Sequence, residues 1–404
     1  VYKRQGFGPV IYSRMDGRGT RWQIAALPFG GYVKFAGDAN AASGKDEEAM
    51  AAVETDPAAL RRTMHGAPLW ARAATVAAGP AFNFALSIIV FAVVGYTNGV
   101  TRDPLTVGDV RALPVEVQEL RQGDVVLEIE GATVPSIMDP AAYGQFMTDL
   151  PQKPMLEYTV ERDGLERVVM GPFLRPPLIN AVSPQSAAIA ADLERGDVIT
   201  AIDGTPIFAF QQLKDAVEGS DGRSLSLTVW RDGALLDKVL TPKRVDEPQP
   251  EGGFATQWRI GIASGNAFEP ATESPGVGEA ITGGVAQTWR IVSGSISGLG
   301  HMITGAISTC NLSGPIGIAQ VSGSMASQGV QDFIWFIAVL STAVGLLNLF
   351  PIPALDGGHL VFYGYEAVTG KPPSEGALRI LMGAGLALVL SLMVFALGND
   401  LFCP

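Results

Sequence analysis

The residues best placed to do chemistry follow a long apolar stretch near the end of the chain. Residues 333–350 are predominantly apolar and are followed by Pro351, Pro353 and the motif Asp356-Gly-Gly-His359. The two prolines remove backbone donors and end a regular helix, which frees carbonyl groups at membrane depth that only protein or a water-filled cavity can satisfy. An ionisable residue in that setting is a candidate functional residue. An ordinary helix end is the alternative, because Asp-Gly-Gly is common in turns.

Other groups that could hold a metal ion are few in this sequence. The histidines are His65, His301 and His359; none is followed by glutamate, and no two have metal-binding spacing. A helical His-Glu-x-x-His motif, by contrast, places two imidazoles on one face with a general base beside the first. The cysteines, Cys310 and Cys403, are far apart in the sequence and cannot be assigned a bond, so we expect them to be unpaired.

The composition predicts a protein that lies partly in a membrane. With 404 residues, 47% of them hydrophobic and 17% charged, the chain is too apolar for an ordinary soluble protein and too charged to lie wholly in a bilayer. Three stretches could span the membrane: residues 73–96, residues 333–350 and about residues 380–397. At ~1.5 Å per residue, the first is long enough to cross a hydrocarbon core of ~30 Å with some tilt.

The charge distribution predicts an orientation. Residues 1–72 carry ten Lys and Arg against seven Asp and Glu, a net charge of +3, whereas residues 97–332 carry sixteen against twenty-nine, a net charge of −13. Arg61, Arg62 and Arg72 precede the first span, so the positive-inside tendency places the N-terminal segment in the cytoplasm and the acidic region outside. An acidic exterior also argues against nucleic acid as a partner.

An internal repeat occupies the acidic region. Residues 120–131 recur as residues 193–204, and residues 160–164 recur as residues 229–233. Each copy contains Gly-Asp, an alternating apolar strand, an acidic-Gly turn and a later Asp-Gly hairpin turn, which predicts two small β-rich domains. The copies resemble bacterial PDZ domains, which bind an extended peptide as an added strand. Domains that only fill space above the membrane are the alternative, and no Gly-Leu-Gly-Phe-like loop identifies the groove.

Two further motifs lie before and within the first span. Gly30 and Gly31 separate short apolar runs, which predicts a tight β-hairpin at about residues 23–36, or else a plain surface turn. Asn83 follows Pro80 by three residues and is costly in hydrocarbon unless it is hydrogen-bonded. It could therefore face a polar cavity, or it could pack one helix against another.

Taken in order, these motifs resemble the site-2 protease family of intramembrane zinc metalloproteases. The resemblance is carried by the Gly-Gly segment at residues 27–34, Gly-Pro-x-x-Asn at 79–83, the tandem repeat, Asn-Leu-Ser-Gly-Pro-Ile at 311–316, and Asn-Leu-Phe-Pro-Ile-Pro-x-Leu-Asp-Gly-Gly-His at 348–359. It covers about residues 6–400, and the ordered set is far more specific than any single motif. Members of this family cut membrane-spanning substrates such as anti-sigma factors after another protease has removed the outer domain.

The resemblance implies a role for each matched residue. Asp356 would be the carboxylate ligand of a Zn²⁺ ion whose other ligands and glutamate base come from a His-Glu-x-x-His helix. The residues implied in substrate binding are Gly30, Gly31 and Tyr32 of a membrane re-entrant β-loop, together with Asn83, Asn348, Pro351 and Pro353. The PDZ pair would exclude substrates that retain bulky outer domains.

The expected fold is a polytopic α-helical membrane protein with a membrane-associated β-hairpin and two inserted β-rich PDZ domains. Its expected parts are a cytoplasmic segment with the hairpin (6–72), a transmembrane helix (73–96), PDZ domains (97–175 and 176–247), a linker with a surface helix (248–332), and two transmembrane helices (333–404). Residues 280–308 could equally form a packed helix. The resemblance implies the bacterial inner membrane with periplasmic PDZ domains. It also implies membrane-spanning protein substrates, peptides or C-termini at the PDZ domains, and lipid as partners.

The sequence departs from the family pattern at its beginning. In the family, His-Glu-x-x-His precedes a segment like Gly6-Phe-Gly-Pro, and here that helix is not present. We therefore expect the chain to be N-terminally truncated, without the two histidine ligands and the glutamate base, and inactive as it stands. Residues 1–5 match a translated sequencing adaptor and are left out of the expected fold. A non-catalytic membrane scaffold with PDZ domains is the alternative, which a native start without the zinc motif would favour.

Overall fold

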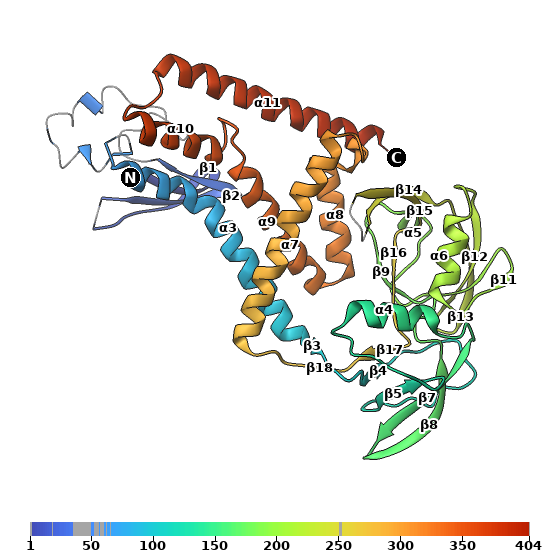
Figure 1. The fold of residues 1–404 in the computed structure, drawn as a ribbon. Coiled ribbons are helices and arrows are strands. Elements are labelled where there is room, and N and C mark those ends of the chain that lie inside the picture. Colours follow the sequence, from blue (N-terminus) through green and yellow to red (C-terminus); the bar gives the residue numbers. More distant parts are fainter. Residues whose placement is uncertain are drawn as a thin grey trace. The chain divides into compact units, whose positions relative to one another are not determined.

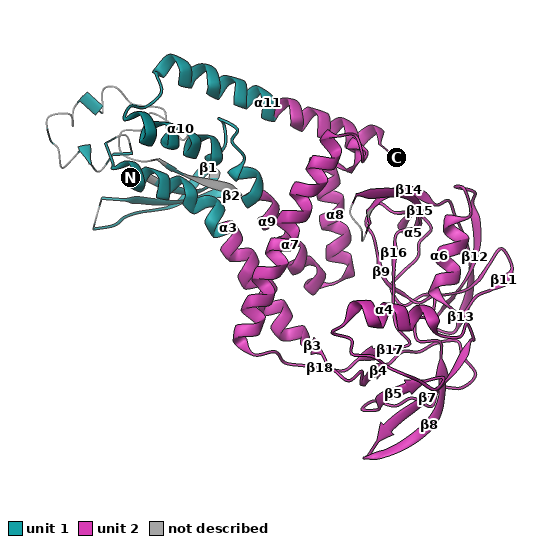
Figure 2. Cartoon of the chain, viewed as in Figure 1, with its two compact units in different colours: residues 1–82, 345–389 teal, residues 83–344, 390–404 magenta. Residues whose placement is uncertain are grey.

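The computed structural model describes residues 2–17, 19–34, 50–51, 56, 60–61, 63–64, 66–249 and 253–403. The chain divides into two compact units, which Figure 2 colours separately. The first unit contains residues 1–82 and 345–389, and the second contains residues 83–344 and 390–404.

Three helices among the described residues are long and apolar enough to cross a membrane. They are α3 (Leu69–Asn98), α9 (Val330–Leu349) and α11 (Glu375–Phe402). Each coincides with one of the predicted spans, and α3 and α11 continue beyond the apolar stretch at both ends. The structure thus has helices of membrane-spanning length and composition at the positions of the three predicted spans (Figure 1).

The first unit contains a long antiparallel hairpin of β1 (Tyr2–Met15) and β2 (Arg21–Lys34). Its turn lies at residues 16–20, where the Gly19 N–H donates to the Asp16 carbonyl. The prediction of a tight turn at Gly30 and Gly31 is therefore wrong, because these residues lie within β2. The Asp-Gly-x-Gly sequence at residues 16–19 supplies the turn instead. Residues 2–5, which the expected fold omits, pair with residues 31–34.

In the second unit the repeat forms two four-stranded sheets with the same order of strands. The first sheet has the order β6-β5-β7-β8 and the second the order β11-β10-β12-β13. Their strands are β5 (Val125–Ile129), β6 (Ala132–Thr133), β7 (Met155–Arg162), β8 (Leu165–Pro172), β10 (Val198–Ile202), β11 (Thr205–Pro206), β12 (Leu225–Arg231) and β13 (Ala234–Leu240). Short helices α4 (Pro140–Asp149), α5 (Ala187–Ala190) and α6 (Phe210–Glu218) accompany them. The two copies are therefore separate β domains of one topology.

The repeated Gly-Asp and Arg-Asp-Gly sequences form the same ion pair in each copy. The buried Asp124 carboxylate accepts hydrogen bonds from Nε and Nη2 of Arg162, both at 2.7 Å. In the second copy the buried Asp197 carboxylate accepts bonds from Nε and Nη2 of Arg231 at 2.6 and 2.8 Å. A buried carboxylate is costly unless it is paired and hydrogen-bonded. This requirement explains why the two short sequences recur together.

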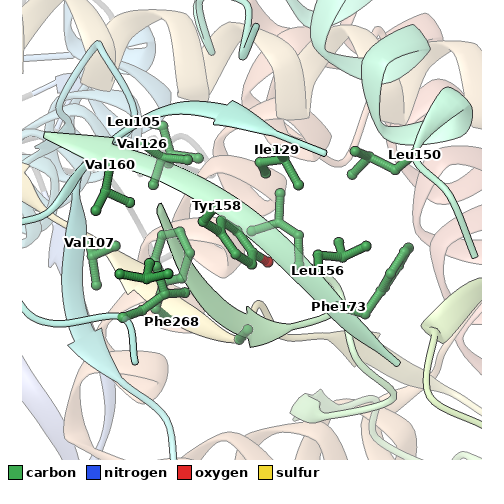
Figure 3. Packing of buried hydrophobic residues seen from close by; sticks show 14 of the residues in the cluster. Leu105, Val107, Val126, Ile129, Leu150, Leu156, Tyr158, Val160, Phe173 and Phe268 are labelled. Atoms are coloured by element: carbon green, nitrogen blue, oxygen red, sulfur yellow. The ribbon is translucent and has the colours of Figure 1, made fainter. Parts of the chain in front are cut away.

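Each β domain has an apolar core of its own. Figure 3 shows the first, in which Leu156, Val160 and Ile129 surround Tyr158. Tyr158 is fully buried, and its hydroxyl donates to the Pro172 carbonyl at 2.6 Å, so its one polar group is satisfied. The alternating apolar residues of the repeat thus form the inner faces of the two sheets.

The expected linker, at the beginning of residues 248–332, is not an unstructured connection. It contains β15 (Phe254–Arg259), β16 (Ile262–Ser264), β17 (Phe268–Pro270) and β18 (Thr272–Glu273), which pair in turn with β14 (Lys243–Pro248), β9 (Ile179–Val182), β4 (Val107–Val110) and β3 (Val100–Thr101). The linker prediction is therefore wrong in this region. Glycine and proline end the short strands, and pairing with distant partners stabilises them against their weak local propensity.

Two helices follow these strands, α7 (Val277–Ile303) and α8 (Pro315–Gln328), with a short 3₁₀ helix at Thr309–Asn311 between them. Ala280, Gly284 and Thr288 of α7 are buried, which gives α7 one narrow face of small residues. That face packs on α3, and a Cβ on Gly284 would lie 3.0 Å from the backbone nitrogen of Ala92. Of the two readings for residues 280–308, packing against another helix is the one observed along this face.

The two cysteines are joined in the structure. Cys310 and Cys403 form a disulfide with their Cα atoms 5.7 Å apart. The expectation that they are unpaired is wrong, because sequence separation did not reveal that the C-terminal end of α11 lies beside the 3₁₀ helix. Asn399 of α11 also donates to the Thr309 carbonyl at 2.7 Å.

Candidate functional site

Asp356 is the first residue of α10 (Asp356–Thr369), directly after the proline-containing turn. Within that turn the Ile352 N–H donates to the Phe350 carbonyl at 2.7 Å and the Leu355 N–H donates to the Ile352 carbonyl at 2.8 Å. The backbone therefore folds back on itself over residues 350–355. This fold places the Asp356 carboxylate at the start of a new helix beside the end of α9.

Gly357 and Gly358 allow the turn to pack directly on α10. Both are buried. A Cβ on Gly357 would lie 2.5 Å from the carbonyl carbon of Leu349 and closer still to two carbonyl oxygens. A Cβ on Gly358 would lie 2.5 Å from the Cα of Pro353. The Asp-Gly-Gly sequence thus has a steric cause, since no side chain fits at either glycine.

Neighbouring helices of the first unit contact this turn and the Asp356 carboxylate. On α3, a Cβ built at Gly79 would lie 3.1 Å from Oδ2 of Asp356. On α11, a Cβ at Gly385 would lie 2.8 Å from the backbone nitrogen of Ala354 and 3.1 Å from Cβ of Pro353. The two glycines therefore permit α3 and α11 to approach the site closely. The site is built from three segments that are distant in the sequence.

An ion pair joins the C-terminal part of α10 to the beginning of α3. Arg72 Nη2 lies 2.5 Å from Oε1 of Glu366, and both side chains are more than four-fifths buried, at 16% and 17% exposure. The Arg72 guanidinium also lies over the ring of Tyr363, 5.3 Å from its centroid. Together with the contact at Gly79, this pair joins α10 to α3 at two points.

The residues described here do not by themselves make up a zinc site. Catalytic zinc has three protein ligands, commonly histidine with a carboxylate. Asp356 supplies one carboxylate, and no group of three His, Cys, Asp or Glu side chains that could hold a metal ion occurs among the described residues. His359, three residues along α10, stacks edge-on against Phe362. His301 lies against Phe254 in the second unit, and His65 lies outside the described residues.

Six of the predicted substrate-binding residues lie in the same unit as Asp356. Asn348 is half-buried in the last turn of α9, Pro351 is exposed and Pro353 is half-buried. Gly30, Gly31 and Tyr32 lie in β2 of that unit, where Gly31 pairs with Gln5 and Tyr32 with Arg4.

Asn83 lies in the second unit and takes part in helix packing. The Ser341 hydroxyl of α9 donates to its backbone carbonyl at 3.0 Å and lies 3.5 Å from its Oδ1. Ser87 Oγ lies 2.9 Å from the carbonyl oxygens of both Asn83 and Ala338. Short hydroxyl side chains thus join α3 to α9 around the Asn83 backbone.

Sequence reasoning missed a pocket in the second β domain. Its volume is about 360 Å³, and it lies between α6 and residues 259–264. The residues that line it are Arg175, Phe210, Gln211, Leu213, Lys214, Val217, Glu247, Arg259, Ile260, Gly261, Ile262 and Ser264. The strand side of this pocket falls in the stretch predicted as a linker, which is why no groove could be assigned. The alternation of Ile260, Ile262 and Ser264 was the available signal.

Comparison with known proteins agrees with the family resemblance of the sequence motifs. The sequence profile of peptidase family M50 matches residues 2–392. The chain is 31% identical over 423 residues to the regulator of sigma-E protease RseP of Escherichia coli, an alignment that covers 98% of this chain and 90% of RseP. It is 29% identical over 419 residues to metalloprotease MmpA of Caulobacter vibrioides, covering 98% of this chain and 86% of MmpA.

Proposed function

The chain belongs to peptidase family M50, and we propose that it cleaves membrane-spanning protein substrates, such as anti-sigma factors, within the bacterial inner membrane. It is a metalloendopeptidase of the site-2 type with zinc as the cofactor of its family. The observation that carries the proposal is the position of Asp356, a carboxylate at the start of α10 that lies beside Gly79 of α3 and follows a turn packed on Gly385 of α11. Such a supporting structure around an ionisable group supports a functional site over a solvated turn.

Asp356 is the carboxylate that this chain contributes to the zinc ion in the proposal. The tight packing of Gly79, Gly357 and Gly385 around the turn restricts where its carboxylate can go, as a metal ligand requires. When bound, zinc activates a water molecule for attack on a peptide carbonyl. Asn348, Pro351 and Pro353 lie in the segment that leads from the end of α9 to Asp356, so a substrate held there would lie near the carboxylate. Proline leaves neighbouring carbonyl groups without intrahelical donors, and these can accept hydrogen bonds from an unwound substrate.

The hairpin of β1 and β2 has a surface suited to lipid, in the proposed role of a membrane re-entrant β-loop. Its exposed side chains include Ile11 at 72%, Met15 at 59% and Ile24 at 52% exposure. Exposed apolar side chains gathered on one hairpin are unfavourable in water. In this role an edge of the hairpin would hold the substrate as an added strand. Gly30, Gly31 and Tyr32 lie on β2, the strand that would provide this edge.

The two β domains are proposed to act as periplasmic PDZ domains that exclude substrates with bulky outer domains. Their shared topology, and the pocket between α6 and residues 259–264, support peptide binding by the second domain. With the β domains in the periplasm, the positive-inside tendency places Asp356 towards the cytoplasmic side.

The proposal is tested by substituting Asp356 in the full-length gene product. We expect Asp356→Asn to lower cleavage of a membrane-spanning reporter by more than about 100-fold, since even the outer-shell partners of metal ligands are worth about 10–100-fold. Zinc bound to the purified protein, measured by mass spectrometry, should fall in parallel.

Asp163→Asn is the matched control. Asp163 is exposed in the β7–β8 hairpin turn at φ 55°, a conformation that asparagine adopts readily. This variant should keep both cleavage and zinc. Undiminished cleavage by Asp356→Asn would exclude Asp356 as a ligand.

A further inference from the structure

Two contacts between α3 and α10 have the same spacing on both helices. Arg72 and Gly79 are seven residues apart on α3, and so are Asp356 and Tyr363 on α10. Seven residues make almost two helical turns, so each pair lies on one face of its helix. A Cβ on Gly79 would lie 3.1 Å from Oδ2 of Asp356. The Arg72 guanidinium lies 5.3 Å from the ring centroid of Tyr363. The two helices therefore pack antiparallel along these faces, over roughly 10 Å.

The contact at Arg72 is the directional one of the two. Gly79 has no side chain, so its part is to leave room for the Asp356 carboxylate. Arg72, by contrast, donates from Nη2 to Oε1 of Glu366 at 2.5 Å while it lies over the ring of Tyr363. Glu366 is three residues beyond Tyr363, which places it on the next turn of α10. Arg72 thus contacts two successive turns of α10 and restrains the rotation of that helix about its own axis.

The ion pair is buried, which makes the packing of α10 sensitive to its loss. Both side chains are more than four-fifths buried, and within the described part of the chain Nε of Arg72 is buried without a hydrogen-bond partner. The guanidinium therefore depends on Glu366 and on the Tyr363 ring for its stabilisation. Removing one charge of such a pair leaves the other uncompensated, whereas exchanging both for apolar side chains of similar size often leaves stability unchanged. Experiment can therefore separate a stabilising role of the pair from a directing one.

The pair acts at the opposite end of α10 from Asp356. Close packing at Gly357 and Gly358 holds the beginning of the helix against the turn that precedes it. Glu366 lies ten residues after Asp356, roughly 15 Å away along the helix axis. A bond at that distance restrains the direction of the axis more effectively than a further contact near the beginning would. A metal ligand must be held within about 0.5 Å of its productive position, so the direction of α10 matters for Asp356.

We propose that Arg72 and Glu366 are positioning residues for the zinc ligand: their ion pair sets the rotation and direction of α10 against α3, and so directs the carboxylate of Asp356. The inference rests on the proposed role of Asp356 as a zinc ligand. In this proposal neither residue touches the metal ion or the substrate, and both act through the helix that begins at Asp356.

The test compares zinc binding by variants of the full-length gene product in detergent. Competition with a chromogenic chelator gives the zinc dissociation constant, and the unfolding midpoint of the zinc-free protein gives stability independently of the metal. We expect Arg72→Gln and Glu366→Gln each to weaken zinc binding by about tenfold, the lower end for groups that support a ligand from outside the coordination shell. Arg72→Glu combined with Glu366→Arg should bind zinc more tightly than either single variant. Binding no tighter than theirs would show that the attraction between the two charges does not direct the helix.

Arg72→Met combined with Glu366→Met separates positioning from stability. The two methionines fill similar space without charge, so the unfolding midpoint should stay near that of the parent protein. Zinc binding, measured well below that midpoint, should still be about tenfold weaker, because the directional bond is gone. Zinc binding equal to that of the parent would overturn the proposal, since the pair would then contribute stability alone.

Arg102→Gln combined with Glu273→Gln is the matched control. This pair also joins an arginine to a glutamate, but its N–O distance is 4.0 Å and its side chains are 54% and 64% exposed. Its loss should change neither the zinc dissociation constant nor the midpoint measurably. Asp356→Asn in the same series keeps the two proposals apart. Zinc bound as tightly by Asp356→Asn as by the parent would remove the ligand itself, whereas zinc lost there but kept by the methionine pair would overturn the positioning role alone.

Discussion

Replacing Gly357 with alanine should displace the backbone that carries Asp356. The added Cβ would lie 2.5 Å from the carbonyl carbon of Leu349, whereas ordinary contacts begin at 3.4 Å. The turn must therefore retreat from α10 by about 1 Å, and backbone atoms cannot avoid the clash by changing rotamer. Pro351 and Pro353 restrict the turn further, since each fixes one of its own dihedral angles.

The size of the effect follows from two opposing contributions. Alanine in place of glycine stabilises a helix by up to about 1 kcal/mol. Overpacking a tightly packed site costs about 1–3 kcal/mol, and more where backbone must move. We therefore expect Gly357→Ala to be destabilising by up to about 2 kcal/mol. Gly364 lies in the same helix with no atom within 4 Å of an added Cβ, so Gly364→Ala should stabilise by about 0.5–1 kcal/mol.

Thermal unfolding in detergent, followed by tryptophan fluorescence, measures both variants. The unfolding midpoint should fall for Gly357→Ala and rise slightly for Gly364→Ala. Reporter cleavage by the full-length gene product should fall only for Gly357→Ala, because only that substitution moves Asp356. If the two variants shift the midpoint in the same direction and cleave alike, the close packing of the turn on α10 is not what positions the carboxylate.

Two further substitutions test other parts of the fold with controls inside the chain. Gly385→Ala should lower reporter cleavage, because its Cβ would lie 2.8 Å from the backbone nitrogen of Ala354. Gly383→Ala meets no atom within 4 Å and should leave cleavage unchanged. Equal cleavage by the two variants would contradict the contact of α11 with the turn. Cys310→Ser removes a disulfide between residues 93 apart in the sequence. In the chain-entropy view this lowers the free energy of unfolding by up to about 4–5 kcal/mol, so the unfolding midpoint should fall. The difference in gel mobility between reduced and oxidised protein should also disappear.

The sequence predicted best those features that depend on local patterns. The three membrane helices follow from apolar length, and the β domains follow from a repeat whose Gly-Asp and Arg-Asp-Gly pieces form the same buried ion pair twice. The position of Asp356 at a break in regular backbone follows from two prolines and two glycines. In each case the determining residues lie within a few turns of one another or recur in register.

Features that depend on distant partners were predicted wrongly. Residues 254–273 have the glycine and proline content of a linker, yet they pair with strands β14, β9, β4 and β3. The hairpin turn was placed at Gly30 and Gly31, because two adjacent glycines are a strong local turn signal. The sequence also contains the Asp-Gly-x-Gly turn at residues 16–19. It could be chosen over the adjacent glycines only if one knew that residues 2–5 pair with residues 31–34. The alternation of apolar and polar residues in a short strand does not specify the strand with which it pairs.

The residues of the motif at 311–317 make contacts with distant parts of the chain that the sequence alone does not indicate. Asp400 of α11 accepts hydrogen bonds from the N–H groups of Gly314 and Ile316, at 2.8 and 3.0 Å, and so caps α8 from another helix. A Cβ on Gly314 would lie 2.5 Å from Oδ2 of Asp400, which explains the glycine before proline in the motif. On its other side the same loop donates from Asn311 and Ser308 to Asp246 of β14. The loop therefore bonds both the C-terminal end of α11 and the hairpin of β14 and β15, so a displacement of that hairpin acts on the loop directly.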